Sequence, residues 1–290
     1  MKVFVTGGTG LIGSAVVAEL LAHGHTVTAL ARSDKSALAA QKAGAEPLRG
    51  GLSDLDVLRT GAGRADGVVH LAFGHDFSSP EAIARSVEEE SAALGALGEV
   101  LTGSGRPLVT VSGTPYVPGR ASTEADPLST DGPVGGRSRS VMRVLGLAER
   151  GVRSISVRLP RTVHNQGNGG FAGLLARMAR QNGACLYPGD GSQRWPAVHA
   201  LDAAVLFRLV LETAPAGTAW HAVADAVRDI ASVIGRRLGL PVEEVPAATF
   251  GPLGAIFATD QPSTSTRTQE ELGWRPAHAS LLQDLENIEP

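Results

Sequence analysis

The sequence predicts an α/β fold in which a parallel sheet carries helices on both faces. Two observations predict it. Short strands alternate with helices throughout the first 160 residues, and such alternation is typical of right-handed βαβ crossovers. In addition, a glycine-rich turn, VTGGTGLIGS, separates the first strand from the first helix. Together they indicate a doubly wound parallel sheet of the Rossmann type, followed by a smaller C-terminal domain.

The elements follow one another in a regular order. Runs rich in valine, isoleucine and threonine predict strands, because branched side chains suit a pleated, buried surface. Apolar residues that recur every three or four positions predict helices. The predicted strands are 2–6, 25–32, 67–73, 106–113 and 153–160, with 45–51 in the place of a third strand. The helices between them are 10–24, 36–43, 53–63, 80–102 and 140–151.

Beyond residue 160 the alternation loosens. A glycine-rich loop leads to a helix at 171–181, and the segment 185–199 precedes a helix at 200–214 and a strand at 218–224. We expect residues 1–160 to form the cofactor-binding domain, with 200–224 returning to it. The remainder of 161–290, which includes small helices from about residue 225, is expected to form mainly a substrate-binding domain or lid.

Composition narrows the class of protein. The 290 residues are 43% hydrophobic and 19% charged, and the net charge is -3, so the basic patch that a nucleic-acid binder needs is not expected. The single cysteine, Cys185, cannot form an internal disulfide, which favours a reducing compartment. No uncharged apolar run approaches 18 residues, so we expect no membrane span and a cytoplasmic protein. The sequence does not predict the oligomeric state.

The glycine turn is the strongest chemical signal in the chain. Gly7 permits a tight turn, Gly10 lets the backbone approach a pyrophosphate, and Gly13 allows the helix to pack closely on the strand. The pyrophosphate then lies at the helix N-terminus, where unpaired N–H groups attract an anion. We therefore predict a dinucleotide site, with further contacts from the rest of the turn: Thr9, Leu11 and Ile12.

The end of the second strand predicts which dinucleotide binds. NAD is usually held there by a carboxylate on the ribose 2′-hydroxyl, whereas this strand ends with Arg32 and Ser33. A guanidinium can stack on adenine and pair with a 2′-phosphate, so NADPH is favoured over NADH. Two alternatives remain open, because Arg32 could be a solvated surface residue and Asp34 could still face the ribose.

The motifs TGGTGLIGS, GGLSD, VVHLAF and VSGTPYVPG follow one another along the chain. On these motifs the chain resembles the extended short-chain dehydrogenase/reductases, including their epimerase/dehydratase branch. TGGTGLIGS is similar to their TGxxGxxG turn, and GGLSD resembles their GDLxD segment, with Gly51 at the first aspartate and Leu52 beside the adenine. VVHLAF resembles the strand-four HLAA segment, and VSGTPYVPG the strand-five SSxxxVYG segment. The resemblance implies further cofactor contacts from residues that match these segments and the LRPxxVYG stretch: Leu71, Ala72, Phe73, Pro160 and Val163.

One motif of that family is missing. Its members carry a YxxxK pair at the start of the helix between strands five and six, in which the tyrosine is the general acid and the lysine holds the nicotinamide ribose. Here the window reads GGRSRSVMR, and no YxxxK occurs anywhere in the chain. Arg139 is the expected substitute for the lysine, on one helix face with Arg143, while Arg137 is placed in the preceding turn. A solvated, basic start to the helix is the alternative.

The resemblance also suggests the residues around a substrate. Thr114 lies five residues before Gly119, which is the spacing of the family's active-site hydroxyl, and Ser112 precedes it by two. His75, in the loop after the fourth strand, is a further catalytic candidate. PGDGSQRWPAVH is similar to a GDGxxxRDFxxVxD element whose arginine often holds an anion. The expected substrate-side residues are Tyr116, His164, Tyr187, Arg194, Trp195 and His199.

Three functions compete for this pattern. The first is an NADPH-dependent reductase of a small-molecule ketone, and the second is a silent NADP-binding sensor. The third, a nucleotide-sugar epimerase or dehydratase, fits least, since those reactions rely on the missing tyrosine. The RWPAVH segment without YxxxK also resembles ketoreductases that act on aromatic polyketides such as angucyclinones. We therefore predict a ketoreductase, and no metal, because the chain lacks HExxH and paired Cys/His spacings.

Overall fold

The main sheet has seven parallel strands. The computed structural model describes residues 1–74, 76, 79–131 and 135–289. The strand order is β10-β6-β5-β4-β1-β2-β3, and every pairing within the sheet is parallel. This confirms the doubly wound α/β fold. The strands are β1 (Lys2–Thr6), β2 (Thr26–Ala31), β3 (Glu46–Arg49), β4 (Gly67–His70), β5 (Pro107–Gly113), β6 (Arg153–Leu159) and β10 (Thr218–His221).

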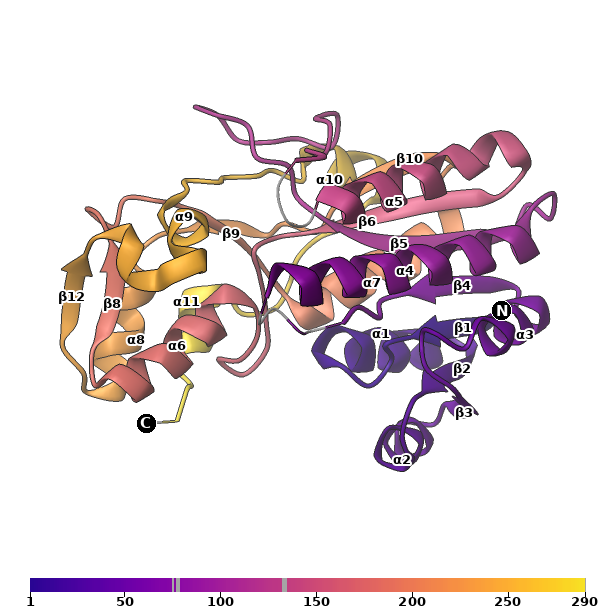
Figure 1. Ribbon diagram of the computed structural model, residues 1–290, viewed down its shortest axis with the longest axis horizontal. Coiled ribbons are helices and arrows are strands. Elements are labelled where there is room, and N and C mark those ends of the chain that lie inside the picture. Colours follow the sequence, from indigo (N-terminus) through magenta and orange to yellow (C-terminus); the bar gives the residue numbers. More distant parts are fainter. Residues whose placement is uncertain (75, 77–78, 132–134, 290) are drawn as a thin grey trace.

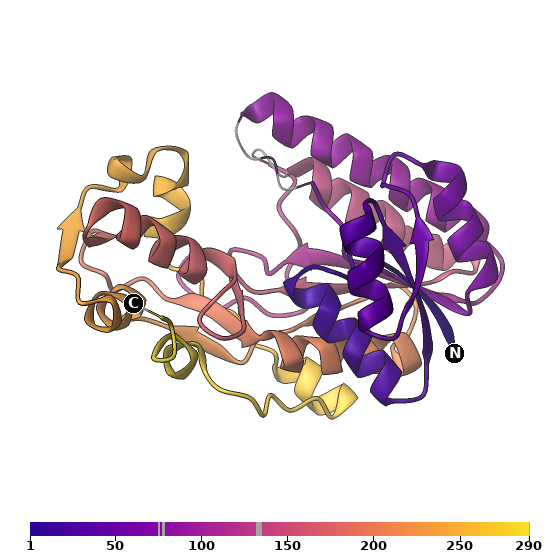
Figure 2. The same ribbon diagram turned by 90° about the horizontal axis from the view of Figure 1, so that it is seen from below.

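Helices cover both faces of this sheet, as Figure 2 shows. One face carries α1 (Leu11–Ala22) and α7 (Ala200–Thr213), and the other carries α3 (Leu55–Arg64), α4 (Pro80–Leu101) and α5 (Gly135–Gly146). α2 (Asp34–Lys42) packs on the edge formed by β2 and β3. Successive residues of β1 alternate between two cores, because side chains of a strand point to opposite faces: Val3 and Val5 pack beneath α1 and α7, while Phe4 packs beneath α3 and α4.

The smaller part of the molecule lies beyond the carboxyl ends of the strands (Figure 1). It contains a three-stranded sheet in the order β11-β9-β7 and a pair, β12-β8. A third hydrophobic core forms beneath its helices. Its strands are β7 (Thr162–His164), β8 (Cys185–Pro188), β9 (Trp195–His199), β11 (Asp225–Val227) and β12 (Val242–Val245). Its helices are α6 (Gly170–Asn182), α8 (Ile230–Leu238), α9 (Gly254–Ala258) and α11 (Leu281–Leu285), with a 3-10 turn at Ala247–Leu253.

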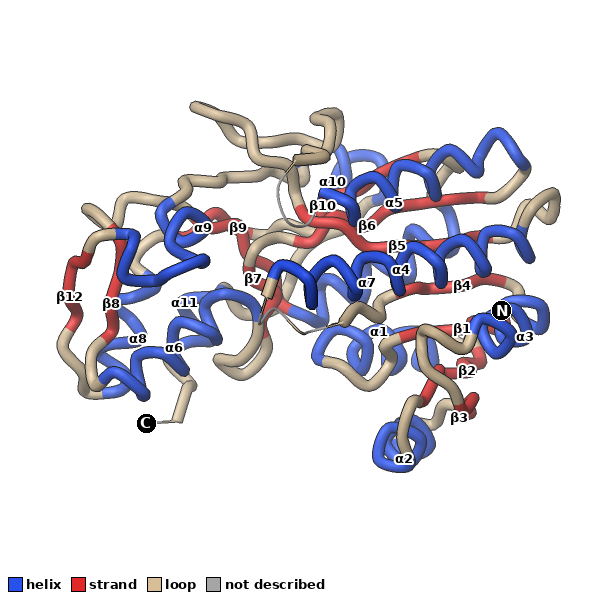
Figure 3. Tube along the Cα trace, viewed as in Figure 1, coloured by secondary structure: helices blue, strands red, loops and turns tan. Residues whose placement is uncertain are grey.

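The chain crosses between the two parts several times. α7 and β10 lie in the main layer, with β10 paired to β6. α10 (Thr266–Leu272) packs on α7 and β10, and Trp274 is fully buried in the core beneath α1 and α7, although the sequence places both in the smaller domain. The long loop after β5, visible in Figure 3, also joins the C-terminal segment through Ser122 and Ser263.

α5 begins earlier than the sequence predicts. The helix starts at Gly135 rather than at residue 140 and is followed by a 3-10 turn at Leu147–Arg150. A β-carbon on Gly135 would lie 1.9 Å from the carbonyl oxygen of Thr130, so only glycine fits this start. The run GGRSR has no apolar periodicity, and the sequence therefore did not reveal the helix there. Among the described residues, no helix combines the length and apolar character needed to cross a membrane.

Candidate dinucleotide and substrate site

The glycine turn between β1 and α1 is shaped by close backbone contacts. Gly7 has a φ of +72°, and a β-carbon there would lie 2.8 Å from the backbone nitrogen of Ala72. A β-carbon on Gly13 would lie 2.0 Å from the carbonyl oxygen of Gly7. At Gly10, in contrast, the nearest atom to such a carbon is the Gly7 carbonyl oxygen at 3.5 Å. Gly7 and Gly13 are thus required by the fold, whereas Gly10 borders open space.

The N-terminus of α1 fits an anionic group. Gly10 is the N-cap, and no side chain of a described residue caps the helix. The first N–H groups of α1 can therefore donate hydrogen bonds to a ligand, and the helix dipole favours negative charge there. Thr9 and Leu11 are exposed beside this point. A pyrophosphate fits the open side of Gly10 on these grounds.

The segment after β4 lies against this turn. The hydroxyl oxygen of Thr6 accepts hydrogen bonds from the backbone nitrogens of Leu71 and Ala72, at 3.2 and 3.3 Å. The residues Leu71, Ala72 and Phe73 are half-buried, as Leu52 is, while Pro160 and Val163 are buried. The expected cofactor residues that follow β4 thus begin next to the glycine turn.

Arg32 and Ser33 follow the end of β2 and differ in their contacts. Arg32 is exposed. The Ser33 hydroxyl caps α2, accepting a hydrogen bond from the Ser36 backbone nitrogen at 3.2 Å, so its oxygen already has a structural role. Asp34, the competing ribose ligand, forms an ion pair with Arg49 at 3.2 Å. Of these three side chains, Arg32 is the one with no hydrogen bond or ion pair to another described residue.

The three arginines of the RSRSVMR stretch have different partners. Arg137 lies within α5, not in a preceding turn: its Nε donates to both carboxylate oxygens of Glu90, at 3.0 and 2.9 Å, and its guanidinium carbon lies 4.2 Å from the centroid of the Phe73 ring. Arg139, the expected cofactor ligand, donates to the carbonyl oxygen of Thr130 at 2.8 Å and is exposed. Arg143 donates to Ser91 on α4. Arg137 is therefore the arginine that reaches the β4 segment.

A buried histidine ends β4. His70 Nδ1 lies 3.0 Å from the Thr6 hydroxyl, and its Nε2 has no hydrogen-bond partner within the described part of the chain. Burial, and to a smaller extent the charge of Arg137, lowers the pKa of His70 to about 3. The imidazole is therefore neutral at physiological pH and cannot serve as a proton donor.

Two hydroxyls mark the end of β5. Ser112 shares a hydrogen bond of 3.0 Å with the Ser156 hydroxyl on β6. Thr114 is buried, and its hydroxyl has no partner among the described residues. Since buried hydroxyls normally find a partner, Thr114 is the better candidate for a ligand contact. His75, the third catalytic candidate, lies outside the described residues.

A polar chain joins Thr114 to the smaller core. The amide nitrogen of Gln261 donates to the carbonyl oxygen of Thr114 at 2.9 Å, and the side-chain oxygen of Gln261 accepts from Arg161. The Arg161 guanidinium lies 5.5 Å from the centroid of the Trp195 ring, and burial lowers the pKa of Arg161 to about 10. The end of β5 is thereby fixed relative to Trp195.

Trp195 and Tyr187 line a cavity of about 190 Å³ together with Phe257 and Leu175. Its polar wall includes Asp190, Gln193 and Arg228. Arg194 lies outside this wall: its Nε and Nη2 donate to the two carboxylate oxygens of Asp260, at 3.1 and 2.7 Å. Tyr116 does not border the cavity and is 54% exposed. Of the expected substrate residues, the cavity thus brings together only Tyr187 and Trp195.

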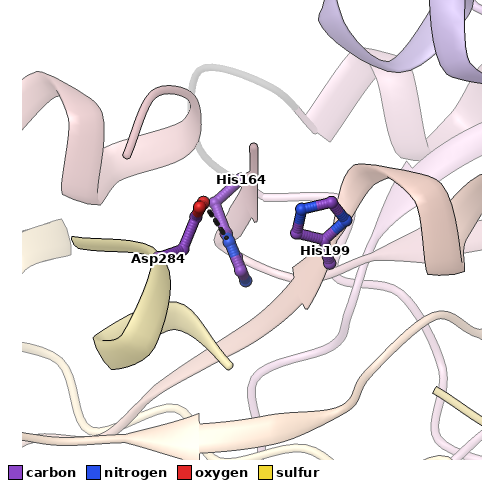
Figure 4. Close-up of side chains that lie close together, drawn as sticks. All are labelled: His164, His199 and Asp284. Carbon is purple, nitrogen blue, oxygen red and sulfur yellow. Dashed lines mark hydrogen bonds and ion pairs between the residues drawn. The ribbon is translucent and has the colours of Figure 1, made fainter. Parts of the chain in front are cut away.

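His164 and His199 form a separate buried cluster with Asp284. Adjacent positions on β7 and β9 place their rings 5.3 Å apart, and His164 Nδ1 lies 2.8 Å from the Asp284 carboxylate (Figure 4). One ligand atom from each residue falls within 4.8 Å of the others, so the three meet the spatial criterion for a metal site that sequence spacing had argued against. However, His199 Nδ1 accepts the Leu201 N–H at 3.2 Å.

That hydrogen bond determines which nitrogen of His199 carries the proton. An Nδ1 that accepts must have a free lone pair, so Nε2 holds the hydrogen of the neutral ring and offers no lone pair to a metal. Burial, and then the neighbouring His164, lowers the pKa of His199. His278 stacks on His199 at 5.0 Å between ring centroids and pairs with Asp202. The cluster therefore fastens the C-terminal segment to β7 and β9.

Several residues of this site were not predicted from the sequence. They are Glu90, Gln261, Phe257, Asp260 and Asp284. A local signal existed only for Glu90, which lies four residues after Ser86 and four before Leu94 on the buried face of α4. A carboxylate on an apolar helix face needs a partner.

Comparisons with known proteins agree with the observed fold and identify the family. The model of the NAD dependent epimerase/dehydratase family matches residues 3–222. An uncharacterised protein of Schizosaccharomyces pombe is 40% identical over 292 residues, which are 98% of each chain. A 2-alkyl-3-oxoalkanoate reductase of Stenotrophomonas maltophilia is 30% identical over 234 residues, 76% of this chain and 68% of that protein. A dTDP-glucose 4,6-dehydratase of Streptomyces venezuelae, solved with NAD, shares the fold with a TM-score of 0.80 at 21% identity, covering 99% and 95% of the two chains.

Proposed function

Because the chain belongs to the NAD-dependent epimerase/dehydratase family, we propose that it is an NADPH-dependent reductase of a small-molecule ketone that works without a Tyr–Lys pair. The observation that carries the proposal is the hydroxyl of Thr114. This hydroxyl is buried at the end of β5 and has no hydrogen-bond partner among the described residues. A substrate carbonyl oxygen would accept the hydrogen bond that it can donate.

The chain's own residues supply binding and orientation. The open side of Gly10 and the N-terminus of α1 would hold the pyrophosphate, and Arg32 the 2′-phosphate. When bound, the nicotinamide supplies the hydride. Thr114 would hold the carbonyl oxygen through its hydroxyl, and the Gln261–Arg161 chain would keep that residue in place. His70, being neutral, would not supply the proton.

The aromatic part of the cavity wall favours a flat substrate. Tyr187, Trp195 and Phe257 offer aromatic surface, which suits a polycyclic aromatic ketone such as an angucyclinone. The nucleotide-sugar alternative would use Arg194 to hold an anionic group. Asp260 already pairs with that guanidinium through two hydrogen bonds, so its charge is neutralised within the protein. This pairing favours the ketone over the nucleotide sugar.

The proposed activity is tested with purified full-length protein in two steps. NADPH binding is first titrated by fluorescence, and oxidation of NADPH is then followed at 340 nm with a panel of ketones that includes polycyclic quinones. UDP-glucose and dTDP-glucose form a second arm, analysed for sugar products. We expect turnover of at least one aromatic ketone and no change in either sugar. NADPH binding without turnover of any ketone would support the sensor instead, and conversion of a sugar would support an epimerase or dehydratase.

Arg32 should determine the choice of cofactor. Replacing Arg32 with alanine should weaken NADPH binding by about 1–3 kcal/mol, the value of a charge-assisted hydrogen bond to a phosphate. NADH, which lacks that phosphate, should bind almost as before. Calorimetric titration of both cofactors gives the comparison. An equal loss for the two would mean that Arg32 packs on the adenine, and the preference for NADPH would lose its basis.

A further inference from the structure

The window GGRSRSVMR, where the family carries its lysine, contributes one member of a pair of charged residues from two helices. Arg137 on α5 and Glu90 on α4 form an ion pair of 2.9 Å. Glu90 is 1% exposed, and the Arg137 side chain is 25% exposed. A carboxylate buried to this degree requires a permanent partner, because an isolated buried charge is costly. The pair therefore holds the guanidinium in one orientation.

The contacts of Arg137 leave part of its donor set unused. Only Nε donates to Glu90, while the guanidinium plane rests on the Phe73 ring. The two terminal nitrogens carry four further N–H groups, and these have no hydrogen-bond partner in the part of the chain that the structure describes. Arg139 and Arg143 differ in this respect, since one terminal nitrogen of each donates to a group of the protein. Among the described residues, Arg137 is the arginine of α5 whose two terminal nitrogens are both unpaired.

The fold would place the terminal N–H groups of Arg137 beside the nicotinamide half of a dinucleotide bound at the glycine turn. Phe73 belongs to the segment that contacts the glycine turn through Ala72. The strand order runs β5-β4-β1-β2, and a dinucleotide spans such a sheet across the switch point next to β1. Arg32 at the end of β2 lies on one side of that point, and Arg137, near β4 and β5, lies on the other. If Arg32 faces the adenine half, Arg137 faces the nicotinamide half.

We propose that Arg137, oriented by Glu90, binds the ribose hydroxyls or the phosphate of the nicotinamide half of NADPH. This inference rests on the proposed cofactor. A guanidinium presents a planar fork of donors, which suits two adjacent hydroxyls or a phosphate better than the point charge of a lysine. It cannot release a proton at physiological pH. Arg137 would thus position the cofactor and leave the proton to another source.

The test compares a ligand that has both halves of the cofactor with one that has only the adenine half. NADPH and adenosine 2′,5′-bisphosphate, which lacks the nicotinamide half, are titrated calorimetrically against the same protein. Arg137→Ala should weaken NADPH binding ~10–100-fold, the range for charge-assisted hydrogen bonds, and leave the bisphosphate unchanged. Arg32→Ala should weaken both ligands. Arg139→Ala, on the same helix, is the matched control and should alter neither. Arg137→Lys should recover part of the loss.

Arg137→Ala leaves the Glu90 carboxylate buried without its cationic partner, which could destabilise the fold. A second variant therefore distinguishes a loss of binding from a loss of the fold. The double variant Arg137→Met with Glu90→Gln removes both charges, and its thermal unfolding is compared with that of the wild type. It should show the same selective loss for NADPH. Equal losses for NADPH and the bisphosphate, or no loss for either, would refute the role of Arg137 while leaving the proposed reductase intact. A wild-type protein that binds neither ligand would refute the cofactor itself, and with it both proposals.

Discussion

Replacing Gly10 with valine should abolish NADPH binding and leave the protein folded. The backbone at Gly10 is extended, with φ −79° and ψ 176°, which valine adopts without strain. A β-carbon there would meet only the Gly7 carbonyl oxygen, at 3.5 Å. The added side chain would therefore fill the open side of the turn, where the pyrophosphate must approach the helix N-terminus. We expect the affinity to fall by more than ~100-fold, or ~2.7 kcal/mol.

A second glycine of the same turn supplies the contrast. Gly13→Ala would place its β-carbon 2.0 Å from the Gly7 carbonyl oxygen, so α1 would have to move away from β1. This variant should lose thermal stability as well as binding, whereas Gly10→Val should keep the wild-type unfolding temperature. Fluorescence titration with NADPH and circular dichroism give the two readouts. Normal NADPH affinity in folded Gly10→Val protein would show that the cofactor does not bind at this turn.

Reduction should continue without any tyrosine. The chain has two, Tyr116 and Tyr187; the first is 54% exposed and the second lines the cavity wall. Neither lies on α5, where the family places its general acid. The double variant Tyr116→Phe with Tyr187→Phe should therefore retain most of its rate. The proton must come from elsewhere, and a ketone with an adjacent phenol already holds one in an internal hydrogen bond to the reacting oxygen.

Changing the substrate should affect the rate more than changing the tyrosines. Methylating the adjacent phenol removes the proton donor, and general acid catalysis is typically worth about 10²–10⁴ in rate. The methylated ketone should lose a factor in that range in kcat, while a matched ketone methylated at a distant hydroxyl should react normally. Orientation against the nicotinamide would then be the protein's main contribution. Collapse of activity in the double tyrosine variant would instead assign the acid role to Tyr116 or Tyr187.

The fold was predictable from the sequence because its signals are local. Strand and helix periodicity, together with the three glycines of the first turn, each occupy a short window. The partners of the site residues lie much further apart along the chain. Arg194 meets Asp260 across 66 positions, and His164 meets Asp284 across 120. No pattern in a single sequence records such a pairing, since it depends on how the smaller part folds back.

The predicted position of Arg137 before the helix was wrong for a different reason. The sequence placed the helix start at residue 140, which put Arg137 in a turn, whereas α5 begins at Gly135. Helix ends depend on caps and close contacts rather than on periodicity, and here the decisive contact is between Gly135 and Thr130. Glu90 was the one sequence signal for the position of Arg137, because a carboxylate on the buried face of α4 needs a cationic partner nearby.

The burial of Trp274 has a consequence for how the protein is made. The indole nitrogen donates to the carbonyl oxygen of Asp202 at 2.9 Å, and its ring completes the core that also contains Val5 and Val69. Val5 and Trp274 lie far apart in the sequence, so a ribosome delivers Val5 long before Trp274. An N-terminal unit usually folds while the rest is being translated, but this core reaches its full packing only once residue 274 has been added. We expect the surface that Trp274 covers to stay exposed in the nascent chain until then.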